Sequence, residues 1–428
     1  MIEFESAGFA LPETLGAPRT ALAEPLPSIV KGGRAEIVFR GTPPAALSVP
    51  PRWTAVRAAD RDGRAVYVVS APERTEAREA RIFAALADGA GELALPLAVL
   101  DALAIRMAPS PFRDGVAGIG FEVRNHGASA QTLRWRLAVP EAFAMANGSF
   151  KLNQPDPFAP DFATEPAGEL TIDPGGLAAA SAMVRNLDPL ALYRAVLEIA
   201  VDGRAITRER RFGGCVGVPK VSRPVAFDGR LGDPAWRDAP EVRLDQPSQY
   251  AVLTRSTARR DNPEDLSGAM KLLWDDDFLY IGMAVQDDVF CNPECDAAIW
   301  RGDGLQFLVD PCRDSEDKPG KYDYCLGLGT KGPQAWCGCT ADAARAPTEE
   351  VSDFRMKITP TGHRGDVVYE IAVPWNRLSP FAPAPGANLG LAMIVNDDDG
   401  RIRDSFIAWF GCAHSKQMSM NGDLILLG

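Results

Sequence analysis

The sequence contains no long apolar run, and this absence argues against a membrane-spanning helix. A span needs about 20 consecutive apolar residues. The most apolar stretch, residues 93–107, is interrupted by Pro96, Asp101 and Arg106. Residues 1–16 also lack a basic segment followed by an apolar one, so no secretory signal can be read from the given sequence. We therefore expect no membrane span.

Basic residues are scarce relative to acidic ones. The chain has 45 Lys and Arg against 57 Asp and Glu, which gives a net charge of −12. From Val218 onward the counts are 22 and 32, so most of the excess acidity belongs to the second half of the chain. Nucleic-acid affinity rests on Lys and Arg residues that neutralise phosphates. The composition therefore predicts that nucleic acid is not a partner.

Motifs for nucleophilic, phosphate or dinucleotide chemistry are also missing. The three His residues, at positions 126, 363 and 414, are far apart in sequence and form no recognisable set with Ser, Cys or Asp. No glycine-rich phosphate loop, dinucleotide-binding fingerprint or internal repeat occurs. The acidic run 396–400 does not fit an EF-hand, because a loop with Gly400 at its sixth position would begin at Val395 and end at Phe406. A tight acidic hairpin is the better interpretation.

Cysteine is missing from the first 214 residues. All eight cysteines lie between Cys215 and Cys412, and an even number permits either disulfides or free buried thiols. Disulfides are favoured if the protein is exported. A zinc site is a further alternative for four of the loop cysteines, Cys291, Cys295, Cys337 and Cys339.

Gly (39) and Pro (35) are abundant and separate short stretches that alternate between apolar and polar residues. Residues 35–39, 64–69 and 133–139 are examples. A period of two is typical of strands, and frequent turns favour β-sandwiches over long helices. A Gly- and Pro-rich stretch at residues 213–219 marks a boundary. The sequence predicts an all-β chain of three consecutive β-sandwich domains, at residues 1–102, 103–218 and 219–428.

Residues 219–428 carry five ordered blocks of aromatic and acidic residues. These are Asp228-Gly229 with Asp233-Pro234-Ala235-Trp236, Trp274 to Tyr280, Trp300 to Asp310, Glu370 to Trp375, and Asn396 to Trp409. In this order the blocks resemble a family 9 carbohydrate-binding module. The preceding strands, with the turn Asn125-His126-Gly127, resemble the small immunoglobulin-like modules that flank bacterial glycoside hydrolases.

The resemblance implies a β-sandwich that binds sugars, in several members at the reducing end of a glycan, with one sugar ring held between two aromatic side chains. Residue by residue, Trp300 and Trp409 match the two aromatic plates. Gln306 stands six residues after Trp300, where the family often has Glu as an acceptor for a sugar hydroxyl, and Gln lacks the charge-assisted bond. Trp336, in a Gly- and Pro-rich segment, is a candidate for a further contact.

Every Trp also has a structural alternative, because Trp in an all-β domain packs in the core more often than against a ligand. We interpret Trp236, Trp274 and Trp375 as core residues. Trp409 lies in the apolar stretch 406–410, so its side chain can equally point inward. The resemblance also leaves room for structural calcium, to which Asp287 and Asp288 can contribute, although no spacing singles out a ligand set.

The sequence therefore predicts non-catalytic carbohydrate binding as an accessory part of a bacterial polysaccharide-degrading system. Carbohydrate and a carbohydrate-active enzyme are the expected partners, and family resemblance favours an extracellular or cell-surface location. The alternative is a structural or cell-surface assembly protein that uses the same sandwich without binding sugar. A third interpretation is a glycoside hydrolase with Asp303 and Glu370 as its paired carboxylates.

Overall fold

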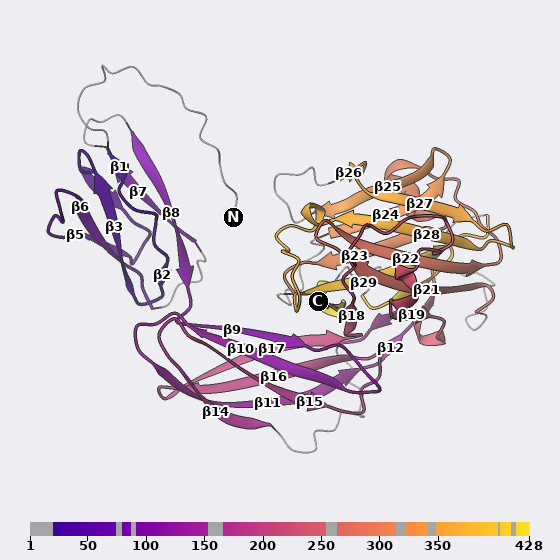
Figure 1. Ribbon diagram of the computed structural model, residues 1–428, viewed down its shortest axis with the longest axis horizontal. Coiled ribbons are helices and arrows are strands. Elements are labelled where there is room, and N and C mark those ends of the chain that lie inside the picture. Colours follow the sequence, from indigo (N-terminus) through magenta and orange to yellow (C-terminus); the bar gives the residue numbers. More distant parts are fainter. Residues whose placement is uncertain are drawn as a thin grey trace. The chain divides into compact units, whose positions relative to one another are not determined.

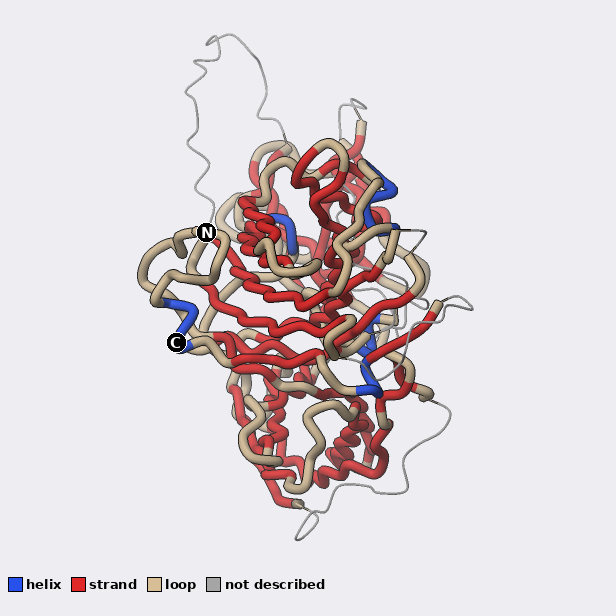
Figure 2. The backbone as a smooth tube through the Cα atoms, turned by 90° about the vertical axis from the view of Figure 1, so that its right-hand side faces the viewer, coloured by secondary structure: helices blue, strands red, loops and turns tan. Residues whose placement is uncertain are grey.

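The computed structural model describes residues 20–73, 79–86, 91–152, 166–253, 263–313, 322–340, 348–400, 403–411 and 417–428. Strands dominate this part of the chain (Figure 2). Its helices are short: α1 (Ala235–Asp238), η1 (Pro247–Gln249), η2 (Asp296–Arg301), η3 (Trp375–Leu378) and η4 (Met418–Met420). None of the described helices has the length and apolar character that crossing a membrane requires. The prediction of an all-β fold is confirmed.

The chain divides into two compact units. One comprises residues 1–105, 123–131 and 171–178, and the other comprises residues 106–122, 132–170 and 179–428. Three pairs of sheets follow one another along the chain (Figure 1). The boundaries expected at residues 102 and 218 stay a prediction.

The first pair of sheets is a small sandwich within the first unit. One sheet has the order β1-β3-β6-β5 and the other β2-β8-β7-β4. Every second residue of β7 points inward, so Ala80, Ile82 and Ala84 are buried while Glu79 and Arg81 are exposed. The strands are β1 (Ala21–Leu22), β2 (Ile29–Val30), β3 (Arg34–Arg40), β4 (Ala46–Ser48), β5 (Thr54–Arg57), β6 (Ala65–Ser70), β7 (Glu79–Ala85) and β8 (Glu92–Leu100).

The second pair comprises a three-stranded sheet, β15-β10-β9, and a four-stranded sheet, β14-β11-β16-β17. Phe121 of β10 packs edge-on against Trp135 of β11 with 5.1 Å between ring centroids. A short hairpin, β12-β13, follows β11. The strands are β9 (Leu103–Pro109), β10 (Ala117–Asn125), β11 (Gln131–Phe143), β12 (Met145–Ala146), β13 (Ser149–Phe150), β14 (Ala167–Ile172), β15 (Leu177–Val184), β16 (Leu192–Val201) and β17 (Arg204–Gly213).

The third pair is the largest and lies entirely in the second unit. A nine-stranded sheet has the order β18-β31-β29-β23-β24-β25-β26, with β30 also paired to β29 and β20 paired to β30. Its strands are β18 (Val216–Val218), β20 (Tyr250–Val252), β23 (Gly304–Asp310), β24 (Tyr322–Gly329), β25 (Gly332–Thr340), β26 (Glu349–Glu350), β29 (Asn388–Asp397), β30 (Ser405–Trp409) and β31 (Gly422–Leu426). A five-stranded sheet has the order β19-β21-β22-β28-β27. Its strands are β19 (Glu241–Leu244), β21 (Leu266–Trp274), β22 (Phe278–Asp287), β27 (Arg355–Pro360) and β28 (Val367–Pro374).

The core of this large sandwich forms from alternate residues of its two sheets. Leu305, Phe307 and Val309 of β23 pack with Ile281 and Met283 of β22. Trp274 and Trp375 lie in the same core, whereas Trp236 is buried on the other side of the five-stranded sheet under the segment 225–239. All three side chains are buried, which confirms their interpretation as core residues.

Buried charges connect the second and third pairs of sheets inside the second unit. Arg210 of β17 donates a hydrogen bond from Nη2 to Asp423 Oδ1 of β31 at 2.7 Å. Arg313 donates to both oxygens of the same carboxylate, from Nε and Nη2, at 2.9 Å each. The pKa of Asp423 would rise through burial alone, but the two guanidinium groups outweigh that effect and hold it below its usual value.

Candidate functional site

The nine-stranded sheet has two faces with different roles. In β23, Leu305 and Phe307 point into the core between the sheets, whereas Gln306 and Leu308 point to the opposite side because side chains alternate along a strand. We call this opposite side the outer face. A second apolar cluster lies on it: Ala251, Leu308, Ala392, Ile394, Phe406, Ala408 and Met418.

Trp300 lies at the outer face. It is in η2, and its backbone carbonyl accepts a hydrogen bond from Asn396 Nδ2 at 3.1 Å. The guanidinium of Arg403 lies 5.6 Å from the Trp300 ring centroid and 5.2 Å from the Phe406 ring centroid. Trp300 is 37% exposed, the only one of the described tryptophans among the exposed large apolar side chains. Its ring can therefore receive a ligand on the solvent side.

Trp409 points to the other side of the same sheet. It is 2% exposed and packs in the core between the sheets with Ile407 and Met393. Phe406, three residues earlier in β30, belongs to the outer face, and an odd offset along a strand reverses the side-chain direction. The structure therefore does not bring Trp300 and Trp409 together around one space.

Gln306 and Trp336 lie on the outer face with Trp300. Gln306 is buried and donates from Nε2 to Asp323 Oδ1 at 2.9 Å. Its backbone pairs with Cys325 of β24, which pairs in turn with Trp336 of β25. Neighbouring strands are about 4.8 Å apart, so Trp336 lies about 10 Å from Gln306 along one row of the outer face. Trp336 is half-buried.

Sequence reasoning missed two residues of the outer face, Arg403 and Asn396. The Nε and Nη2 atoms of Arg403 are buried and have no hydrogen-bond partner among the described residues. Burial lowers the pKa of this guanidinium to about 10. The Oδ1 atom of Asn396 is likewise buried without a described partner, although its Nδ2 is used on Trp300. Both residues lie within the sequence block Asn396 to Trp409, but nothing in that pattern singles out Arg403 as a ligand-binding residue.

An acidic cluster lies next to this group of residues. Asp287, Asp303 and Asp397, each 2% exposed, place carboxylate oxygens within 4.8 Å of one another. Burial, together with repulsion between the carboxylates, raises the pKa of all three, that of Asp397 to about 7. A second group with the same spacing comprises Asp265, Asp288 and Asp399. These two groups are the candidate metal sites found among the described residues.

The donor set fits a hard divalent cation. Six carboxylates in two groups provide only oxygen ligands, which Ca²⁺ prefers, and gathering them is costly unless a cation balances their charge. Asp287 and Asp288, the two residues considered from the sequence, fall in different groups. The Asp303 carboxylate also accepts hydrogen bonds from the backbone N–H groups of Cys291 and Asp398. This carboxylate therefore connects the segments that carry Trp300 and Asn396.

The other chemistry considered from the sequence is not assembled in the described structure. No cysteine of the described residues belongs to a metal-ligand group. The Cys339 side chain and Cys412 lie outside the described part. Asp303 precedes β23 of the nine-stranded sheet, whereas Glu370 belongs to the five-stranded sheet and accepts a hydrogen bond from Gly229 N–H. The structure therefore does not bring these two acids together as a pair.

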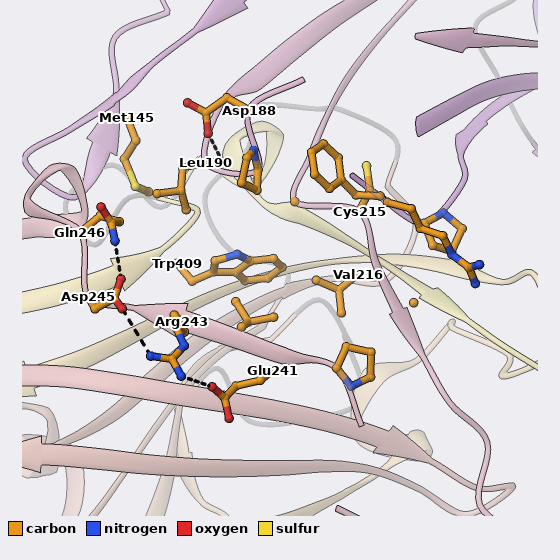
Figure 3. A pocket seen from close by; sticks show the side chains of 18 of the residues that line it. Met145, Asp188, Leu190, Cys215, Val216, Glu241, Arg243, Asp245, Gln246 and Trp409 are labelled. Carbon is orange, nitrogen blue, oxygen red and sulfur yellow. Dashed lines mark hydrogen bonds and ion pairs between the residues drawn. The ribbon is translucent and has the colours of Figure 1, made fainter. Parts of the chain in front are cut away.

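Trp409 lies beside a cavity of about 940 Å³ between strands of the second and third pairs of sheets (Figure 3). Met145 and Leu190 line it from one side, and residues 240–243, 245 and 246 line it from the other. Arg243 is ion-paired with Glu241 at 3.0 Å and with Asp245 at 4.0 Å. Arg243 thus has carboxylate partners at this cavity, in contrast to Arg403. We therefore place the candidate ligand site on the outer face.

Comparisons with known proteins agree with the order of the sequence blocks. Residues 227–427 match the model of the family described as "Carbohydrate family 9 binding domain-like". A family 9 carbohydrate-binding module from Caldicellulosiruptor kristjanssonii, solved with cellotriose, is 19% identical, with 50% of this chain and 93% of that chain covered and a TM-score of 0.37. The family 9 module from the same organism solved with glucose is 18% identical, with 50% of this chain and 95% of that chain covered and a TM-score of 0.37. A red sea bream transglutaminase is 10% identical over 76% of this chain and 31% of that chain, with a TM-score of 0.21. A search of curated proteins finds no match.

Proposed function

We propose, from the match of residues 227–427 to the family described as "Carbohydrate family 9 binding domain-like", that the protein binds carbohydrate on the outer face of its nine-stranded sheet without transforming it. The observation that carries the proposal is the half-exposed ring of Trp300 beside unpartnered polar atoms of Asn396 and Arg403. A pyranose presents one apolar face and a rim of hydroxyl groups. A ring platform with polar groups at its side is complementary to both.

Each residue has a separate role in this proposal. Trp300 covers the apolar face of the sugar, and Asn396 Oδ1 accepts a hydrogen bond from a hydroxyl group. Arg403 supplies donors on the side of the ring that faces Phe406. Gln306 and Trp336 extend the site along the sheet for a second sugar unit. Trp409 is not part of this site, because its side chain lies in the core.

Calcium has a supporting role in the proposal. Asp287, Asp303 and Asp397 would hold one ion, and Asp265, Asp288 and Asp399 a second. The bound ions would neutralise the repulsion among these carboxylates. Because the Asp303 carboxylate accepts hydrogen bonds from the segments that carry Trp300 and Asn396, this neutralisation would stabilise the arrangement of the sugar-binding residues. Calcium here orders the site and does not contact the sugar.

The setting follows from the kind of domain. A binding domain without chemistry of its own is useful when it keeps a carbohydrate-active enzyme close to an insoluble or polymeric substrate, because linked sites raise the effective concentration. We therefore propose an accessory role in polysaccharide degradation, outside the cell or at its surface. The two preceding sandwiches would serve as spacers.

The proposal is tested by titrating the protein with cellotriose and glucose, the sugars bound in the related modules, while intrinsic Trp fluorescence is recorded. An apolar contact of roughly 100 Å² contributes about 2.5 kcal/mol. Trp300→Ala should therefore weaken binding by at least about tenfold. Trp135→Ala, which removes a half-buried Trp from the second pair of sheets, is the matched control and should leave the affinity unchanged. Equal binding by both variants would disprove the site, and a folded wild type that binds neither these sugars nor an acidic oligosaccharide would disprove the function.

A further inference from the structure

Arg403 carries a charge that nothing in the described structure balances. Its guanidinium lies between the rings of Trp300 and Phe406, and its buried Nε and Nη2 atoms have no hydrogen-bond partner among the described residues. Burial lowers its pKa, and the one group that opposes this effect is the thiol of Cys325. A charge that is largely removed from water without a counter-charge is costly, and pairing with an anion reduces this cost.

The unpartnered atoms have a specific geometry. Nε–H and one N–H of Nη2 lie on the same edge of the planar guanidinium, and this edge matches the two oxygens of a carboxylate. Arg313 demonstrates the arrangement in the same unit, since its Nε and Nη2 donate to both oxygens of Asp423 at 2.9 Å each. The equivalent edge of Arg403 has no such acceptor among the described residues.

We infer that the ligand of the outer face is an acidic carbohydrate, whose sugar ring packs on Trp300 while its carboxylate binds the Nε and Nη2 edge of Arg403. A uronic acid has both features, because its carboxylate is attached directly to the pyranose ring. This inference rests on the proposed function and specifies the substrate class of the same site. Asn396 Oδ1, which is also unpartnered, then accepts a hydrogen bond from a hydroxyl of the same sugar.

Binding requires a local movement, because the Nε and Nη2 atoms of Arg403 are buried in the described conformation. Two rings lie against the guanidinium, and they differ in freedom to move. Phe406 is 1% exposed within the outer apolar cluster, whereas Trp300 is 37% exposed. Trp300 is therefore the ring that moves aside and then closes on the sugar. Its fluorescence should change on binding of the acidic ligand.

The neighbouring aspartates set a condition for the experiment. Asp303 and Asp397 are near Trp300 and Asn396 in sequence, and their carboxyl groups would repel the carboxylate of a ligand when they are ionised. Bound calcium offsets these charges, so the measurements are made at saturating calcium chloride. Low and high salt are compared, because an interaction between the ligand charge and Arg403 weakens as ionic strength rises.

The test compares trigalacturonic acid with its methyl ester, which has the same rings without the charges, and with a sulfated disaccharide and cellotriose. We expect the acid to bind at least about tenfold more tightly than the ester, as a charged bidentate hydrogen bond would give. In Arg403→Gln the ratio of the two affinities should fall to about one. Arg301→Gln is the matched control, because Arg301 lies 5.5 Å from the same Trp300 ring but is exposed, and it should keep the ratio.

The outcomes separate this inference from the proposed function. Equal affinities for acid and ester, both lost in Trp300→Ala, would overturn the acidic ligand and leave carbohydrate binding intact. Absence of binding to every sugar, cellotriose included, would overturn both. Tighter binding of the sulfated disaccharide than of the uronate would overturn the carboxylate. If Arg403→Gln does not fold, the comparison of acid and ester on the wild type still decides the question.

Discussion

Arg313 and Arg403, two arginines of the second unit, differ in what surrounds their charge. Each of the three guanidinium nitrogens of Arg313 donates a hydrogen bond. The acceptors are the carboxylate of Asp423 and the backbone carbonyls of Met418 and Asn421. Arg403 makes ring contacts but no hydrogen bond among the described residues. A balanced charge such as that of Arg313 is explained by folding alone. The proposed ligands, an acidic sugar and calcium, would balance the charge of Arg403 and of the clustered aspartates.

The largest expected effect is on the stability that the buried ion pairs of Asp423 with Arg210 and Arg313 provide. Asp423→Ala leaves the charges of Arg210 and Arg313 buried without their shared acceptor. We expect the free energy of unfolding to fall by about 3–5 kcal/mol. Denaturant unfolding measures this loss. A loss below about 1 kcal/mol would show that Asp423 does not balance the charges of Arg210 and Arg313.

The pH dependence of the same cluster provides a check on its cause. The pKa of Asp423 is lowered in the folded state, because the attraction of Arg313 and Arg210 outweighs burial. The stabilisation is therefore complete above the unfolded pKa of about 3.9 and is lost as the pH falls through the lower folded pKa. The difference in unfolding free energy between the wild type and Asp423→Asn should shrink as the pH falls below about 4. A constant difference would contradict the assignment.

The next largest effect is the stabilisation that calcium provides when it binds the two groups of clustered aspartates. Calcium that binds the folded protein alone stabilises it by about 2.7 kcal/mol at one hundred times its Kd. We expect the melting temperature of the chelator-treated protein to rise when calcium chloride is added. Asp287→Asn should reduce this rise, whereas Asp238→Asn, an exposed acid of α1, should preserve it. The same response in both variants would contradict a site at Asp287.

A smaller effect of opposite sign is expected at Arg403. Arg403→Met keeps an apolar chain between the rings of Trp300 and Phe406 and removes the unpartnered charge. The unliganded protein should become more stable by about 1–2 kcal/mol. Arg313→Met, the matched change at the balanced site, should destabilise it. If both substitutions destabilise the protein, Arg403 has a structural role in the unliganded protein, and its charge is then no evidence for a ligand.

Several features of the protein follow from short-range patterns that a sequence contains. Alternation identifies strands such as β3 and β6, and the density of Gly and Pro excludes long helices. The buried positions of Trp236, Trp274 and Trp375 were predictable, because each stands at a turn or a strand end beside apolar residues. Asp287 and Asp288 were recognised as candidate calcium ligands, but their four companions were not.

The sequence by itself determined the all-β class and the family-like order of the aromatic and acidic blocks, because both depend on residues close together along the chain. Only the tertiary structure decided the faces and the clusters. Trp409 points inward because β30 pairs with β29 in a register that directs Phe406 outward. Asp287, Asp303 and Asp397 meet although more than a hundred positions separate the first from the last. Arg403 gains its role only from the rings on either side of it, which is a property of packing that no local pattern encodes.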